Sequence, residues 1–139
     1  MKKTLNSFLL FLVLVICLSS CTAPTDVDTL WENATYTEDT ELGVGETTVI
    51  VEVKTENRSV SFTINTDKTI LGEALIEHSL IEGEDGQYGL YIKKVSGILA
   101  DYEVNGRYWA FYKNGEYMIT GVDSTEISDG EHYELVYSK

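Results

Sequence analysis

Alternating hydrophobic and polar residues predict two adjacent strands near the middle of the chain. Apolar residues occupy every second position between residues 47 and 55, and the same alternation returns between residues 60 and 65. The apolar members are Val49, Val51, Val53, Val60, Phe62 and Ile64. A period of two places alternate side chains on opposite faces of a strand. Because only the turn-forming segment 56–59 separates the two runs, we expect a β-hairpin with one buried face.

A helix is expected after this hairpin. The residues at helical spacing are Leu71, Ala74, Leu75 and His78. Thr69 precedes them as a candidate N-cap, so the pattern predicts a helix over about 70–80. A turn is expected at 83–86, a strand at 88–95, and a last strand at 132–137. One helix packed on one face of a sheet makes an α+β domain, and we expect residues 47–139 to form it without metal.

The clearest local signal is the dipeptide Asn114-Gly115, which favours a two-residue hairpin turn between segments 107–113 and 116–120. A two-residue loop fixes the register, so Tyr112 is expected opposite Tyr117. One face then carries Trp109, Phe111 and Met118, and the other carries Tyr108, Ala110, Tyr112, Tyr117 and Ile119. Both faces of this hairpin are therefore apolar.

A sheet covered by one helix needs only one apolar face, so the second apolar face of this hairpin needs an explanation. We expect Trp109, Phe111 and Met118 to fill the core. Tyr108, Tyr112 and Tyr117 then point outward as candidate ligand-binding residues, since Tyr combines flat contact area with a hydroxyl group. The alternative is that cross-strand Tyr pairs only stabilise the sheet.

The N-terminus has the pattern of a lipoprotein signal peptide over residues 1–20. Two lysines precede an apolar run that is shorter than a membrane-spanning helix. The run ends in Leu18-Ser19-Ser20-Cys21, which matches a bacterial lipobox. The sulfur of Cys21 would take a diacylglycerol, and two or more acyl chains anchor a protein stably. We therefore expect a lipid anchor on the extracellular face of the cell membrane; the alternative is an ordinary secretory signal.

Residues 21–46 are expected to form an acidic tether between the lipid and the domain. The stretch is polar, contains the only Pro of the chain, and keeps no helical or strand period. A polar, acidic segment of this kind stays extended and solvated. Trp31 is the exception, and two places remain open for it: docked on the domain, or near the lipid interface.

Composition narrows the classes of function. The 139 residues include 23 acidic and 10 basic side chains, for a formal charge of −13. Such a surface repels phosphates, so we expect no nucleic-acid partner. Of the two Cys, one leaves with the signal peptide and Cys21 would be lipidated. Redox catalysis and Cys metal ligation are therefore not expected.

Candidate chemistry is sparse, and we do not expect an enzyme. No nucleophile-and-base arrangement can be assembled from the two His in the sequence. His78 falls on the apolar stripe and is interpreted as a satisfied buried residue, while His132 is expected to be exposed. The acidic segment around Glu82, Glu84 and Asp85 admits a weak calcium site, but a solvated loop fits its spacing better. No metal or cofactor is expected.

Five short segments carry a resemblance to a known family. They are Thr69-Ile70-Leu71-Gly72-Glu73-Ala74-Leu75, Tyr108-Trp109-Ala110-Phe111-Tyr112-Lys113-Asn114-Gly115, Gly121-Val122-Asp123, and Ile127-Ser128-Asp129-Gly130-Glu131 with Tyr133-Glu134-Leu135-Val136-Tyr137. Together they resemble the bacterial transcobalamin-like domain of unknown function, common in surface lipoproteins of Gram-positive bacteria. The resemblance covers about residues 49–137. It implies a β-grasp-like fold related to the C-terminal domain of transcobalamin and intrinsic factor, which hold cobalamin between this domain and a large helical barrel.

Two function classes follow from these observations. The first is a membrane-anchored surface lipoprotein whose domain binds a corrinoid, such as cobalamin, or a similar small molecule and delivers it to a membrane transporter. The second is a protein-interaction or adhesion module that uses the same sheet surface. The resemblance supports the first, whereas the outward tyrosines fit either class.

Overall fold

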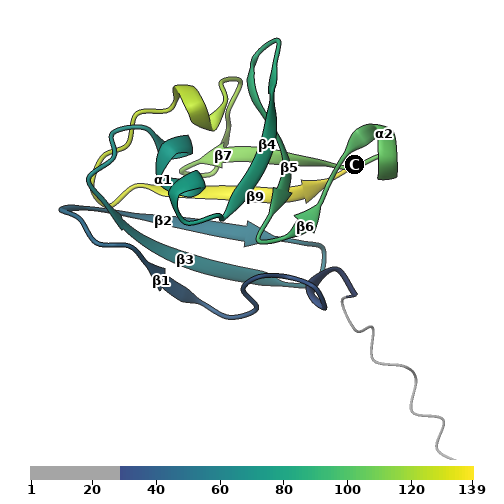
Figure 1. Ribbon diagram of the computed structural model, residues 1–139, viewed down its shortest axis with the longest axis horizontal. Helices are drawn as coiled ribbons and strands as arrows, with labels where there is room; N and C mark the ends of the chain where they lie inside the picture. Colours follow the sequence, from purple (N-terminus) through teal and green to yellow (C-terminus); the bar gives the residue numbers. More distant parts are fainter. Residues whose placement is uncertain (1–28) are drawn as a thin grey trace, which may run out of the picture.

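The computed structural model describes residues 29–139 (Figure 1). The predicted signal peptide, the lipobox with Cys21 and the first part of the expected tether lie outside the described residues. The helical elements are η1 (Thr29–Trp31), α1 (Leu71–Glu77), α2 (Tyr102–Asn105) and η2 (Val122–Ser124). The strands are β1 (Thr40–Leu42), β2 (Thr47–Lys54), β3 (Ser59–Thr66), β4 (Ile81–Gly86), β5 (Gly89–Val95), β6 (Ile98–Leu99), β7 (Tyr108–Lys113), β8 (Glu116–Tyr117) and β9 (His132–Ser138).

Six strands form a mixed sheet in the order β1-β3-β2-β9-β7-β8. The predicted hairpins β2–β3 and β7–β8 are both present and antiparallel. The last strand, β9, lies between them, parallel to β2 and antiparallel to β7. The short strand β1 adds to the edge of the sheet, parallel to β3. The α+β class is therefore confirmed.

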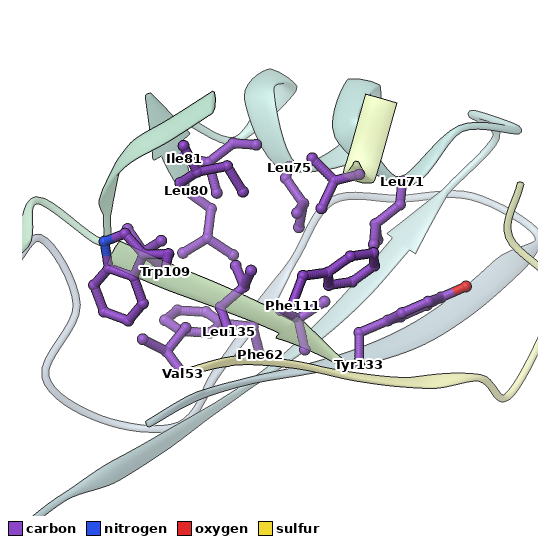
Figure 2. Close-up of a cluster of buried hydrophobic side chains, with 14 of the residues drawn as sticks. Val53, Phe62, Leu71, Leu75, Leu80, Ile81, Trp109, Phe111, Tyr133 and Leu135 are labelled. Carbon is purple, nitrogen blue, oxygen red and sulfur yellow. The ribbon is translucent and has the colours of Figure 1, made fainter. Parts of the chain in front are cut away.

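The core lies on one face of this large sheet. Alternate residues of β2, β3, β7 and β9 point into it, and they pack against α1 and the strand that follows it (Figure 2). Figure 2 shows Leu71, Leu75, Leu80 and Ile81 above the sheet and Phe62, Trp109, Phe111, Tyr133 and Leu135 rising from it. The alternation read from the sequence thus identifies the buried face of each strand.

The cover over the core differs from the single helix that we expected. A second sheet, in the order β4-β5-β6, shares this role with α1 (Figure 1). Val95 and Ile98 of this small sheet belong to the same buried cluster as Leu75. A helix of seven residues is too short to cover six strands by itself, so a second layer of strands completes the core.

The beginning of α1 also differs from the prediction. Its N-cap residue is Ile70, which makes no side-chain cap hydrogen bond. The backbone N–H of Leu71 instead donates to the carbonyl of Thr125, and Ile70 forms an isolated bridge with Glu126. Thr69 is therefore not the cap; the segment directly after η2 satisfies the helix N-terminus from outside.

Residues 29–46 belong to the folded domain, whereas the sequence placed them in a tether. Trp31 is 2% exposed, and its indole Nε1 donates a hydrogen bond to Thr55 Oγ1 at 2.9 Å. The ring of Tyr36 contacts Phe62 edge-on, with centroids 5.5 Å apart. These aromatic anchors bury enough apolar surface to order a polar segment, so the first of the two places considered for Trp31 is the observed one. No helix within residues 29–139 is long and apolar enough to span a membrane.

Candidate functional site

The outer face of the large sheet, opposite the core, carries the three candidate tyrosines. Tyr108 and Tyr112 alternate along β7 with the buried Trp109 and Phe111, so their side chains point away from the core. Tyr117 of β8 lies opposite Tyr112 in the register, as predicted. The two rings meet edge-on at 79°, with centroids 5.5 Å apart. The structure thus brings Tyr112 and Tyr117 together, with Tyr108 two residues along the same strand.

These tyrosines differ in exposure. Tyr117 is 58% exposed, while Tyr108 and Tyr112 are partly exposed and Ala110 between them is buried. The strand β8 ends at Tyr117, although the sequence predicted a strand to Thr120. Ile119, expected beside the tyrosines, is 92% exposed in the segment that follows. We call Tyr108, Tyr112 and Tyr117 the tyrosine face.

A charged strip adjoins the tyrosine face on β2 and β9. Its members are Glu52, Lys54, His132 and Glu134, whose side chains share the outer side of the sheet. Lys54 Nζ lies 3.2 Å from Glu52 Oε2 and 3.1 Å from Glu134 Oε2. His132 Nε2 lies 3.5 Å from Glu52 Oε2, and the histidine is partly exposed. Glu134 stands opposite Tyr112 in the register, so the strip and the tyrosine face are continuous.

Hydrogen bonds keep the acid and the base of this strip ionised. Burial alone would raise the pKa of Glu52, but hydrogen bonds from Ser59 and Lys54 outweigh it and leave that pKa below its ordinary value. Burial alone would lower the pKa of Lys54, but its bonds to Glu134 and Glu52 leave that pKa raised. The strip therefore presents fixed charges beside a hydrophobic surface.

Sequence reasoning missed this charged strip. The polar positions of β2 and of β9 were visible as alternation, but they meet only because β9 pairs in parallel with β2. That pairing joins residues about 80 positions apart, and no turn signal specifies it. An opposite-charge pattern on two predicted strands was the only available hint.

Candidate metal ligands are dispersed over the described part of the chain. Within residues 29–139, no group of three or more His, Cys, Asp or Glu side chains is placed to hold a metal ion. The acidic segment interpreted as a loop is in fact strand β4. Glu82 pairs with Lys94 at 3.1 Å, and Glu84 pairs with Lys93 at 3.0 Å, so neighbouring lysines on β5 neutralise both carboxylates.

His78 lies on the helix as expected, but one of its ring nitrogens lacks the hydrogen bond that we expected. It is the C-cap of α1 and is half-buried. Its Nε2 atom is buried and has no hydrogen-bond partner within residues 29–139. Gly43 passes so close that a Cβ there would lie 2.6 Å from this Nε2. The imidazole is therefore a packing residue whose polar atom remains unpaired.

Comparison with known protein families assigns a family to the C-terminal half of the chain. A model for a domain of unknown function (DUF4430) matches residues 67–139, from the loop before α1 to the end of β9. The chain belongs to this family. The matched part includes the tyrosine face and the β9 half of the charged strip, while β1, β2 and β3 precede it. No curated protein sequence matches this chain.

Solved structures show the same fold. A protein from Ruminococcus gnavus ATCC 29149, described as a proposed metal-binding protein, is 35% identical, with a TM-score of 0.63 over 68% of this chain and 98% of that chain. Haptocorrin, solved in complex with Cbi, is 20% identical, with a TM-score of 0.54 over 70% of this chain. This chain spans 26% of haptocorrin. These findings support the transcobalamin-like domain that the motifs indicated.

Proposed function

We propose that this domain is a non-enzymatic binding module for a corrinoid or a similarly planar small molecule, and that the tyrosine face holds the ligand. The observation that carries this proposal is the placement of Tyr112 and Tyr117. Both lie on the side of the sheet away from the core and contact each other, with Tyr117 58% exposed and Tyr112 partly exposed. The fold likeness to haptocorrin in complex with Cbi supports the ligand class.

The physical basis of the proposed binding is flat apolar contact beside fixed polar groups. Tyr rings present large flat areas, and Tyr side chains lose little conformational entropy when a ligand covers them. The adjoining carboxylates of Glu52 and Glu134 are held in place by Lys54, so they offer oriented acceptors to amide N–H groups at the rim of a planar ligand. This combination suits a broad, flat molecule with polar substituents.

We further propose that Cys21 carries a lipid and holds the domain at the extracellular face of the cell membrane, where it would pass its ligand to a membrane transporter. The lipobox supports this proposal. The acidic residues between Cys21 and η1 would then form the spacer.

A spectral titration tests the ligand class. Cobalamin and cobinamide are added to a soluble chain starting just before Thr29, because residues 29–46 belong to the fold. We expect a shift of the corrin absorption bands, and about tenfold weaker binding for Tyr117→Ala and Tyr112→Ala. Tyr88→Ala is the matched control, because Tyr88 is 85% exposed on the β4–β5 turn. An unchanged spectrum at millimolar corrinoid would refute the proposal.

A protein-interaction module remains the second candidate, because the apolar surface continues beyond the tyrosines. Val136 of β9 and Ile50 of β2 lie on the same outer side, and Ile50 is 38% exposed. A flat sheet surface with central Tyr residues and a charged rim also suits a protein partner. Cross-linking on intact cells, compared between the parent and Tyr117→Ala, separates this candidate from small-molecule binding.

A further inference from the structure

A cleft opens at one end of the large sheet, where β2 and β9 finish and β7 begins. It has a volume of about 420 Å³ and is lined by Leu30, Glu56, Asn57, Arg107, Tyr137 and Lys139. Tyr137 belongs to the core side of β9, since it pairs in register with Trp109 and contacts that ring. The cleft is therefore separate from the tyrosine face, which lies on the other side of the sheet.

The cleft concentrates positive charge in a strongly acidic protein. Four lysines in residues 29–139 form salt bridges with carboxylates, namely Lys54, Lys93, Lys94 and Lys113. The other four cations of this part of the chain are Arg58, Lys68, Arg107 and Lys139. Two of these four line the cleft, and Arg58 follows the lining residue Asn57. Cations that form no salt bridge within residues 29–139 thus gather at this end of the sheet.

The guanidinium group of Arg107 is held in place without using its N–H groups. Its Cζ lies 5.4 Å from the centroid of the Tyr137 ring, in a cation–π contact. The hydroxyl of that ring accepts a hydrogen bond from Asn105 Nδ2 at 3.4 Å, which fixes the ring in turn. No side-chain hydrogen bond or ion pair of Arg107 occurs within residues 29–139. A pre-oriented guanidinium with free donors is the group that best matches a carboxylate.

We propose that this cleft binds a small monocarboxylate with an apolar or aromatic body. Arg107 would take the carboxylate through two N–H groups, and Lys139 would add a second positive charge. Leu30 and Tyr137 supply the apolar walls for the body of the ligand. Asn57 offers an amide for a further polar substituent.

Glu56 sets the charge that the ligand can carry. Glu56 lines the same cleft and is exposed. It would repel a second negative charge, so a dianion such as hydrogen phosphate fits less well than a monoanion. This predicts a preference that a simple basic patch would not show, because a basic patch favours the ion of higher charge.

The test is a calorimetric titration of the full chain, kept in mild detergent because of its apolar N-terminal run. The probe is 3-phenylpropionate, compared with the neutral 3-phenylpropanol and with inorganic phosphate. We expect saturable binding of 3-phenylpropionate in the millimolar range, and at least about tenfold weaker binding of the other two. Absence of binding by the carboxylate, or equal or tighter binding of phosphate, would overturn the proposal.

Matched variants locate the site. Arg107→Ala is expected to weaken binding of 3-phenylpropionate by about tenfold or more. Lys139→Gln should also weaken binding of 3-phenylpropionate. Because Lys139 lies beyond the last residue of β9, this substitution should leave the fold intact. Lys68→Gln is the control, because Lys68 is an exposed cation at the opposite end of the sheet, next to the end of β3. Unchanged binding by both Arg107→Ala and Lys139→Gln would overturn the assignment, as would an equal loss in Lys68→Gln.

Discussion

The hydroxyl of Tyr133 donates a hydrogen bond to the carboxylate of Glu131, two residues earlier in the chain. Lys113 Nζ lies 2.7 Å from the other oxygen of this carboxylate, and it also lies over the Tyr133 ring at 5.7 Å. Tyr133 is fully buried, so burial raises the pKa of its hydroxyl, and the Glu131 carboxylate raises it further. The three side chains thus tie the start of β9 to the end of β7 with no polar atom of Tyr133 left unpaired.

Replacing Glu131 tests how much these interactions contribute to the free energy of unfolding. In Glu131→Gln the amide keeps the shape but loses the charge that Lys113 pairs with. Hydrogen bonds to charged groups contribute about 1.5–3 kcal/mol, so we expect a loss of about 1–3 kcal/mol in the free energy of unfolding. Urea denaturation measures it. Glu126→Gln, an exposed carboxylate five residues earlier with no ion pair within residues 29–139, should change the midpoint little.

The same group predicts how stability depends on pH. Burial would raise the pKa of Glu131, but hydrogen bonds from Lys113, Tyr133 and the backbone of Ser128 outweigh it and leave the pKa below its ordinary value of 4.5. A carboxylate with a lowered folded-state pKa contributes stability above its unfolded pKa. That contribution is lost as the pH falls through the folded pKa.

The free energy of unfolding of the parent should therefore fall as the pH drops below about 4.5. The free energy of unfolding of Glu131→Gln should fall less steeply. Thermal melts between neutral pH and acid measure both slopes. Parallel slopes for the parent and Glu131→Gln would contradict the assignment, and Glu126→Gln should follow the parent.

The local parts of this fold could be predicted from the sequence. Asn114 adopts φ of 50° and Gly115 φ of 82°, so the dipeptide provides the left-handed turn that its composition indicated. The register of Tyr112 against Tyr117 followed from the loop length alone. The inward and outward sides of β2, β3 and β7 followed from the period of two. Each of these predictions used interactions between residues close in sequence.

The parts that failed depend on distant partners. Glycines and acids in β4 suggested a turn, yet the strand forms because β5 supplies its hydrogen bonds and lysines. An exposed edge strand needs no apolar alternation, so its sequence carries no strand signal. Trp31 orders residues 29–46 by reaching the end of β2, which no local pattern reveals. The tyrosine face was therefore predicted, while the charged strip beside it was not.

Truncation at the N-terminus tests whether residues 29–46 stabilise the domain. A chain that begins at Thr47 lacks Trp31, Tyr36 and strand β1, so Phe62 loses a ring contact and the edge of β3 is exposed. Loss of a buried Trp typically costs about 3–5 kcal/mol. We expect a clearly lower urea midpoint than for a chain that begins at Thr29. Equal midpoints would restore the sequence-based boundary.

Chelation tests the expectation that the domain folds without metal. We expect EDTA to leave the melting curve of the chain starting at Thr29 unchanged, because residues 29–139 contain no group of three candidate ligands. A lowered midpoint that is restored by adding a divalent cation would contradict this expectation.

Membrane attachment is predicted to depend on Cys21. In Cys21→Ala the sulfur that would receive the diacylglycerol is absent, so the protein should move from the detergent phase to the aqueous phase. Phase separation and mass spectrometry of the N-terminus measure this. Cys17→Ala is the matched control, because Cys17 lies within the predicted signal peptide and its loss should leave partitioning unchanged.

The two faces of β7 should respond differently to truncation. Trp109 is 7% exposed, its Nε1 donates to the carbonyl of Ile98 at 3.3 Å, and its ring contacts Tyr137. Trp109→Ala removes this packing and leaves that carbonyl without its indole donor. The expected cost is about 3–5 kcal/mol, a large fraction of the stability of a small domain.

Tyr117 is 58% exposed and contacts Tyr112 edge-on, so Tyr117→Ala should cost only about 0.5–1 kcal/mol, the size of one cross-strand pair. Urea midpoints of the two variants, measured with corrinoid binding, separate a structural role from a binding role. Tyr117→Ala should remain folded and bind corrinoid more weakly, whereas Trp109→Ala should be largely unfolded. If Tyr117→Ala unfolds as readily as Trp109→Ala, the tyrosines serve the fold. If Tyr117→Ala stays folded and binds corrinoid as the parent does, the Tyr117 ring contributes neither to stability nor to binding, and the ligand is held elsewhere.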